Sequence, residues 1–204
     1  MRKFNKPIIL ASKSPRRKEI LSSLGYEFHI MVSSKEEIFN NKLSLSDALK
    51  DVALQKAYDV KNEHNIADSI IISADTIVYI NNEILGKPKD QQDAVRMLKL
   101  IQGTKHFVLT AVAVVTDDKV LVDVEQTAVY FKSMTDEEIL NYIEIENVYD
   151  KAGSYAIQGP AKKYIEKIEG NYENVVGLPI NLLERLFEEL WEKILKTQSW
   201  ELVY

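Results

Sequence analysis

The chain has 204 residues, 46% of them hydrophobic and 28% charged, and it contains no cysteine, which excludes disulfides, thiolate catalysis and cysteine-based zinc sites. Its formal net charge of −5 at pH 7 argues against broad binding of nucleic acids, for which basic surface supplies most of the affinity. Because the apolar runs are too short to cross a membrane and the N-terminus does not resemble a signal peptide, we expect a cytoplasmic protein without membrane partners.

Hydrophobic patterns and turn residues predict alternating strands and helices along the whole chain. In chain order they predict a strand over residues 7–12, a helix from Ser14, a strand over 26–32, a loop over 33–45, a helix opening at Ser46 and running to about 63, a strand over 70–80, a turn and short strand over 81–85, a helix from Asp90 to before Gly103, strands over 107–115 and 120–131, a helix from Thr135 to about 146, a glycine-punctuated region over 151–177, and a last helix over 180–195.

Three short motifs support these boundaries. Ser14 followed by Pro15 fits a helix start, since serine caps free amides and proline lacks an N–H where none is needed. Thr135 and Glu138 have the spacing of a capping box, in which each side chain binds the other residue's amide. The pair at residues 81–82 is Asn-Asn, which is typical of a tight hairpin turn.

The alternation of helices and strands predicts an α/β fold with a mixed sheet, because one hairpin interrupts it. We expect one folding unit with two lobes over residues 1–204, whose weakest boundary lies near residues 100–105. For Trp200 and Tyr204 in the tail we expect packing on the body or on a second subunit.

A cluster of hydroxyls and guanidiniums lies where the first strand meets the first helix. Ser12, Ser14, Arg16 and Arg17 surround a helix N-terminus, whose free amides and partial positive charge favour a phosphate. Arginine binds phosphate with two parallel hydrogen bonds. The alternative interpretation is an ordinary helix cap with a solvated basic first turn.

The strand over residues 70–80 contains Asp75 among isoleucine and valine. Aspartate is depleted in strands and costly to bury without a partner, so it points to a metal ligand or a base for water; an aspartate satisfied by backbone amides is the alternative. Lys87 in the following turn could neutralise phosphate, although a solvated turn explains it equally simply. The histidines His29, His64 and His106 have no metal-ligand spacing.

Five segments together resemble the Maf family in order and across nearly the whole chain. Residues 9–17 are similar to its opening Leu-Ala-Ser-x-Ser-Pro-Arg-Arg signature, residues 73–78 to its Ala-Asp-Thr strand, and residues 86–88 to its Gly-Lys-Pro turn. Residues 150–159 (Asp-Lys-Ala-Gly-Ser-Tyr-Ala-Ile-Gln-Gly) and 174–179 (Asn-Val-Val-Gly-Leu-Pro) complete the pattern.

The resemblance implies an elongated mixed sheet flanked by helices, with two lobes around a cleft as in inosine triphosphatase, and a homodimer. It also implies hydrolysis of nucleoside triphosphates to the monophosphate and pyrophosphate with Mg²⁺ or Mn²⁺. Thr76 and Gln158 resemble the branch of the family that prefers dTTP and UTP.

On this resemblance Asp75 is the expected proton acceptor, and Asp75 and Glu37 are the expected metal ligands, with Glu36 as an alternative to Glu37. The expected substrate-binding residues are Ser12, Ser14, Arg16, Lys56, Thr76, Lys87 and Gln158. A rival hypothesis is a nucleotide-binding regulator of cell division with little catalysis. A nucleic-acid-binding module is disfavoured, because the chain lacks an aromatic and basic platform.

Overall fold

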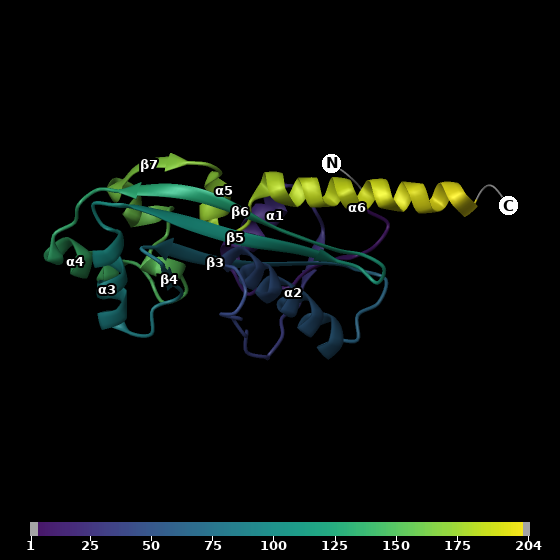
Figure 1. The fold of residues 1–204 in the computed structure, drawn as a ribbon, viewed down its shortest axis with the longest axis horizontal. Helices are drawn as coiled ribbons and strands as arrows, with labels where there is room; N and C mark the ends of the chain where they lie inside the picture. The colour runs from purple at the N-terminus through teal and green to yellow at the C-terminus, as the bar shows by residue number, and fades with distance from the viewer. Residues whose placement is uncertain (1–3, 202–204) are drawn as a thin grey trace. The chain divides into compact units, whose positions relative to one another are not determined.

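The structure is a computed structural model that describes residues 4–201, with side chains described as far as Glu192 (Figure 1). The predicted packing of Trp200 and Tyr204 therefore concerns side chains outside the described residues. The elements are β1 (Ile8–Leu10), α1 (Pro15–Ser23), β2 (Phe28–Ile30), α2 (Leu45–Glu63), β3 (Ile70–Ile80), β4 (Glu83–Leu85), α3 (Gln91–Ile101), β5 (Lys105–Val115), β6 (Val120–Phe131), α4 (Asp136–Ile145), η1 (Ala152–Ser154), η2 (Gly159–Tyr164), β7 (Ile165–Glu169), α5 (Tyr172–Val176) and α6 (Ile180–Glu201).

The described strands form one sheet of seven strands in the order β2-β1-β3-β5-β6-β7, with β4 paired to β3. β1 pairs with β2 and β3 in parallel, whereas β4 pairs with β3, and β7 with β6, in antiparallel register. Asn81 and Asn82 have φ values of 50° and 63°, which a hairpin with a tight two-residue turn requires. The predicted α/β class with a mixed sheet is confirmed.

The chain divides into two compact units. The first comprises Met1–Asp75, Ala111–Val124 and Leu178–Tyr204, and the second comprises Thr76–Thr110 and Glu125–Gly177. The strands β3, β5 and β6 each contribute residues to both units. The boundary expected near residues 100–105 is wrong, because this stretch lies inside the second unit, where Gly103 donates its N–H to the carbonyl of Lys132.

In the first unit, helices cover both faces of the strands (Figure 1). Leu10 and Ile72 face α1 and α6 and pack in one cluster with Phe187, while Ile9 faces α2 in a second cluster with Ala57. Side chains alternate between faces along a strand, so strands covered on both sides are apolar throughout. This explains why β1 and the first half of β3 are continuous apolar runs.

The second unit buries a histidine among aromatic rings. The His106 ring lies 5.6 Å from the ring of Phe131 and 5.3 Å from that of Tyr155. Its Nε2 lies 2.7 Å from the Tyr155 hydroxyl, and its Nδ1 is buried without a hydrogen-bond partner in the described part of the chain. Burial disfavours the charged ring and lowers the pKa of His106 from 6.5 to about 4.

Side-chain caps confirm three predicted helix starts. Oγ of Ser14, Oδ1 of Asp90 and Oγ1 of Thr135 accept backbone N–H bonds of 3.4, 2.8 and 3.2 Å. Glu138 also accepts from the N–H of Thr135 at 2.9 Å, which completes the predicted capping box.

Other boundaries differ from the sequence predictions. α2 begins one residue before Ser46, because Ser44 is the cap and accepts from the N–H of Asp47 at 3.2 Å. α6 extends beyond the predicted end at residue 195, to Glu201. Within residues 151–177, which the sequence analysis described only as a glycine-punctuated region, the chain forms the edge strand β7 and the short helix α5.

Candidate active site

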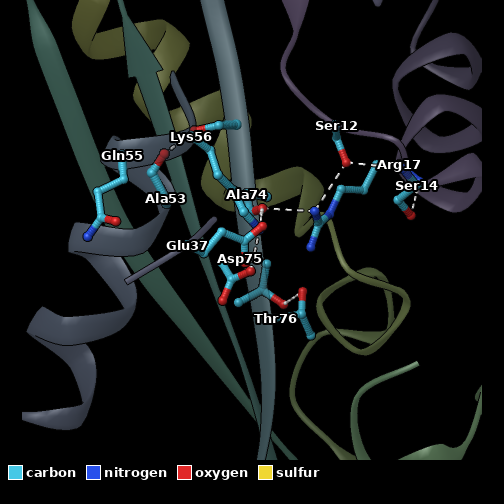
Figure 2. A network of polar contacts seen from close by, with 12 residues as sticks. Ser12, Ser14, Arg17, Glu37, Ala53, Gln55, Lys56, Ala74, Asp75 and Thr76 are labelled. Carbon is cyan, nitrogen blue, oxygen red and sulfur yellow. Dashed lines mark hydrogen bonds and ion pairs between the residues drawn. The ribbon is translucent and has the colours of Figure 1, made fainter. Parts of the chain in front are cut away.

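A charged cluster in the first unit joins β3, α2 and the loop before α2. The ammonium of Lys56 lies 2.5 Å from Oδ1 of Asp75 and 3.0 Å from Oε1 of Glu37 (Figure 2). The side chains of Lys56 and Asp75 are each 17% exposed, whereas that of Glu37 is 52% exposed. The lysine therefore compensates the carboxylate that Asp75 places in an apolar strand.

The register of α2 against β3 fixes this cluster. Ser73 is fully buried and donates its hydroxyl to the carbonyl of Ala53 at 2.5 Å. Lys56 follows Ala53 by about one helical turn, and Asp75 follows Ser73 by two strand residues. The two charged side chains therefore lie on the same faces of α2 and β3 as the residues of this hydrogen bond, and they face each other. One buried hydrogen bond thus aligns the helix with the strand.

The carbonyl of Ala74 connects this cluster to the start of α1. It accepts from Nη1 of Arg17 at 2.8 Å, and the Lys56 ammonium lies 3.5 Å away (Figure 2). The same Arg17 nitrogen donates to Oγ of Ser12 at 3.2 Å. Desolvation lowers the pKa of Arg17, and the charge of Asp75 opposes this shift. A guanidinium consequently holds the backbone immediately before Asp75.

The hydroxyls at the start of α1 bind backbone amides. Ser12 accepts from the N–H of Ser14 at 3.2 Å, and Ser14 accepts from the N–H of Arg17 at 3.4 Å. Arg16 follows in the first turn of α1 and is half-buried. The first turn contains no acidic residue, although acids are the residues that a helix N-terminus favours. The helix start is therefore a basic, hydroxyl-rich site that suits an anion.

Both predicted metal ligands contact the same ammonium group. The carboxylates of Glu37 and Asp75 both contact the Lys56 ammonium. Of the two glutamates that the sequence offered, Glu37 and not Glu36 forms the ion pair with Lys56. Carboxylates are the donors that Mg²⁺ prefers, and Mg²⁺ often uses one or two of them together with substrate phosphates and water. Among the side chains described for residues 4–192, no group of three or more acidic or histidine side chains could hold a metal ion.

Three predicted residues belong to the second unit. The hydroxyl of Thr76 lies 2.9 Å from that of Thr110, while Lys87 and Gln158 are exposed. The N–H of Gly153 donates to the carbonyl of Gly86 at 3.0 Å, so the turn that carries Lys87 lies against η1, which precedes Gln158 in the chain.

Gly153 permits this approach of the two turns. Its φ is +68°, and a Cβ added there would lie 2.8 Å from Cγ2 of Val78. A side chain at this position would therefore face both a strained backbone and a steric conflict.

The structure brings several of the predicted residues into contact within the first unit. In the first unit, Lys56, Asp75 and Glu37 make direct contacts, and the carbonyl of Ala74 links them to the α1 start. The sequence analysis placed Arg17 in the basic cluster at the helix start, but its list of substrate-binding residues named only the neighbouring Arg16. The sequence does show that Arg17 follows the cap Ser14 by three residues, and residues at this spacing lie on one face of a helix.

This arrangement offers three chemical capacities. The carboxylate of Asp75 can accept a proton or bind a cation, the ammonium of Lys56 can neutralise negative charge, and the start of α1 can bind an anion. None of the helices in residues 4–201 combines the length and the apolar composition that crossing a bilayer requires.

Comparison with known proteins identifies relatives of the chain. Residues 7–190 match the family model described as Maf-like protein. A dTTP/UTP pyrophosphatase of Alkaliphilus oremlandii is 52% identical over 177 residues, which cover 86% of this chain and 91% of the relative. A dTTP/UTP pyrophosphatase of Caldicellulosiruptor saccharolyticus is 43% identical over 195 residues, which cover 94% of this chain and 98% of the relative.

A solved structure, that of the Staphylococcus aureus Ham1 protein, matches 90% of this chain and 99% of its own with a TM-score of 0.50 and 12% identity. This likeness concerns the fold alone, and it agrees with the fold expected from the sequence. The sequence relatives confirm the resemblance that the five segments indicated.

Proposed function

The chain belongs to the Maf family, and we propose that it is a nucleoside triphosphate pyrophosphatase that converts dTTP and UTP to the monophosphate and pyrophosphate. The observation that carries this proposal is the largely buried carboxylate of Asp75, which an apolar strand presents beside Lys56, in a chain whose relatives bear the name dTTP/UTP pyrophosphatase. The rival hypothesis, a nucleotide-binding regulator with little catalysis, would be supported by nucleotide binding without turnover.

In the proposed reaction, water attacks the α-phosphorus. Asp75 accepts the proton of this water as the new oxygen–phosphorus bond forms and the bond from the α-phosphorus to the bridging oxygen breaks. Pyrophosphate leaves with the bonding electrons, and Lys56 with the basic start of α1 offsets its negative charge. Phosphoryl transfer depends mainly on positioning and on charge neutralisation, which these residues provide without a covalent intermediate.

We further propose that Asp75 and Glu37 hold a divalent cation, Mg²⁺ or Mn²⁺. Such an ion supplies charge neutralisation to the phosphates. Lys56 contacts both carboxylates and keeps them together when their charges would otherwise repel each other. Ser12, Ser14, Arg16 and Lys87 are proposed phosphate contacts, and Thr76 and Gln158 are proposed contacts to the base.

A nucleotide panel with released pyrophosphate as the readout, with and without Mg²⁺, tests the function. We expect hydrolysis of dTTP and UTP by the parent, and a loss of about 10²- to 10⁴-fold in kcat for Asp75→Asn, the range that general-base catalysis contributes. Asp123→Asn is the matched control, because Asp123 also lies in the first unit and pairs with Lys50 and Arg185. Turnover near the parent rate in Asp75→Asn would show that this carboxylate is neither base nor essential ligand.

The position of attack requires an isotope experiment, because attack at either phosphorus gives the same products. A single turnover in ¹⁸O-labelled water should place the label in the nucleoside monophosphate. Label in pyrophosphate would mean attack at the β-phosphorus, and the basic groups would then need to stabilise a departing monophosphate instead.

The family resemblance also leads us to propose a homodimer that acts in the cytoplasm, where nucleoside triphosphates are made and used. Sedimentation equilibrium should give twice the 23.4 kDa of one chain. A mass of one chain at micromolar concentration would contradict the dimer, and recovery outside the cytosolic fraction would contradict the location.

A further inference from the structure

A row of polar side chains on α2 holds the loop that carries Glu37. The members recur every four residues and therefore lie on one face of the helix; they are Asp51, Gln55, Asp59 and Glu63. The two carboxylate oxygens of Glu63 accept from Ser34, one from its N–H and one from its hydroxyl, each at 3.1 Å. Asp59 pairs with the ammonium of Lys35 at 2.7 Å. The loop before Glu37 therefore follows this face of α2.

Gln55 binds the main chain directly after Glu37. The N–H of Ile38 donates to Oε1 of Gln55 at 3.1 Å, and Nε2 of Gln55 donates to the carbonyl of Ile38 at 2.9 Å. One side-chain amide thus pairs with both polar groups of one residue, as two facing residues of an antiparallel sheet do. The N–H of Ile38 belongs to the planar peptide group that follows Glu37, so this pairing fixes the backbone beside the glutamate.

Three contacts determine the orientation of the Gln55 amide. Its Nε2 also donates to Oδ2 of Asp51, one turn earlier in α2, at 2.8 Å. A carboxylate or carbonyl oxygen accepts and a backbone N–H donates, so turning the amide round would set its oxygen against two acceptors and its nitrogen against a donor. The Ile38 side chain is 71% exposed, so its burial contributes little to holding the loop here.

Glu37 lies where a fixed backbone matters for its side chain. It belongs to a segment between β2 and α2 that has no helix or strand, and its side chain is 52% exposed. Lys56, the residue after Gln55, contacts the carboxylate of Glu37 at 3.0 Å and that of Asp75 at 2.5 Å (Figure 2). An exposed side chain on an unrestrained loop loses conformational freedom when it binds a ligand, and a backbone that is already fixed reduces this loss.

We infer that Gln55 is a positioning residue for the divalent cation, because it fixes the backbone beside Glu37 and so holds that carboxylate toward Lys56 and Asp75. This inference rests on the proposed function and on the proposed role of Glu37 as a metal ligand. Gln55 acts through Glu37 and is not itself a ligand. Its effect on cation binding should therefore require the carboxylate of Glu37.

The first test measures the binding of Mn²⁺ alone to the parent and to Gln55→Met, with electron paramagnetic resonance of the free ion as the readout. Methionine keeps the length of the side chain and removes all three hydrogen bonds of the amide. We expect the dissociation constant to rise about tenfold, the lower end of the effect usual for residues that orient metal ligands. Thermal unfolding checks that the variant folds, and Gln55→Ala, with the same expectation, replaces it if that protein does not fold.

Gln102→Met is the matched control. Gln102 is a half-buried glutamine of the second unit, and its Oε1 accepts from the backbone N–H of Met134 at 3.2 Å. The same substitution there should lower stability and leave the dissociation constant of Mn²⁺ unchanged. An unchanged constant in folded Gln55→Met, or an equal rise in Gln102→Met, would overturn the inference.

A double-mutant cycle separates positioning from a general loss of order. If Gln55 acts through Glu37, Gln55→Met should raise the Mn²⁺ concentration that half-saturates pyrophosphate release from UTP in the parent and have no further effect in Glu37→Gln. Equal rises in both backgrounds would overturn the inference.

The outcomes for the parent distinguish this inference from the proposed function. A parent that releases pyrophosphate from UTP but binds no Mn²⁺ would overturn the inference alone. A parent that binds Mn²⁺ but hydrolyses neither UTP nor dTTP would contradict the proposed function, while the Mn²⁺ titrations still decide the role of Gln55.

Discussion

At the residue scale, the buried polar groups of the candidate site are explained by the partners that they bind. Lys56 and Asp75 compensate each other, and Ser73 binds a backbone carbonyl of α2. Removing one member of such a pair leaves the other buried without compensation, which usually costs more than the pair itself contributes. Lys56→Met should therefore destabilise the first unit as well as weaken phosphate binding.

His106 leads to a prediction about pH. Its pKa of about 4 in the folded protein lies below the ordinary value of 6.5, so the folded state favours the neutral ring. The resulting stability is complete above pH 6.5 and is lost as the pH falls toward 4, by up to about 3 kcal/mol. Urea unfolding of the parent and of His106→Gln between pH 7 and 4 measures this loss.

The difference between the two proteins isolates the histidine from carboxylates that titrate in the same range. We expect the parent to lose more stability than His106→Gln over this interval. His29→Gln alters an exposed histidine of β2 and should follow the parent. Parallel curves for the parent and His106→Gln would show that His106 does not titrate on unfolding.

At the element scale, the sequence predicts helix starts and apolar strands well where one local rule decides them. Ser14 and Thr135 cap as their motifs indicate, and β3 has its predicted ends. The start of α2 differs because Ser44 and Ser46 both suit a cap, and only packing selects between them. The short edge strand β7 has the sequence Ile-Glu-Lys-Ile-Glu, which carries no continuous apolar run, and its pairing to β6 is a long-range choice.

The same limit applies to the candidate site. Asp75 is visible in the sequence because a charge interrupts an apolar strand. Arg17 is hidden beside Arg16, since adjacent arginines differ only in the helix face that each occupies. The buried hydrogen bond of Thr110 gives no signal, because threonine is common in strands and the carbonyl of Asn174 that it binds is far away in the chain.

Two helix caps of similar chemistry separate stability from substrate binding. Ser14→Ala and Thr135→Ala should each lower the free energy of unfolding by about 0.5–2 kcal/mol, the usual cost of losing a cap. Only Ser14→Ala should also raise KM for UTP, because α1 begins at the proposed phosphate site and α4 does not. Equal, small effects on KM would indicate that the Ser-Pro-Arg-Arg segment is merely a cap.

At the scale of the whole molecule, we propose that residues 1–204 fold as one domain although they form two compact units. Three strands contribute to both units, so neither unit is a continuous stretch of chain. Local sequence rules cannot find such a division, because three of its limits fall inside β3, β5 and β6, each of which continues as one strand across the limit.

This proposal predicts cooperative unfolding. Calorimetry and near-ultraviolet circular dichroism should report one transition at the same temperature, with calorimetric and van't Hoff enthalpies equal. Since the association of subunits also affects the melting temperature, the measurement should be repeated at several protein concentrations. Two separate transitions that persist at every concentration would mean that the units unfold independently.

The contact of Gly153 with Val78 restricts how this gene can vary. Every single-base change in a glycine codon that replaces the amino acid introduces a Cβ, and at position 153 that atom would lie 2.8 Å from Cγ2 of Val78. A library randomised at this codon should therefore yield almost exclusively glycine among active clones, and a Val78→Ala background should admit alanine at best, since the backbone there still favours glycine. Inherited variation at the two positions is consequently coupled, and a change at residue 78 must come first.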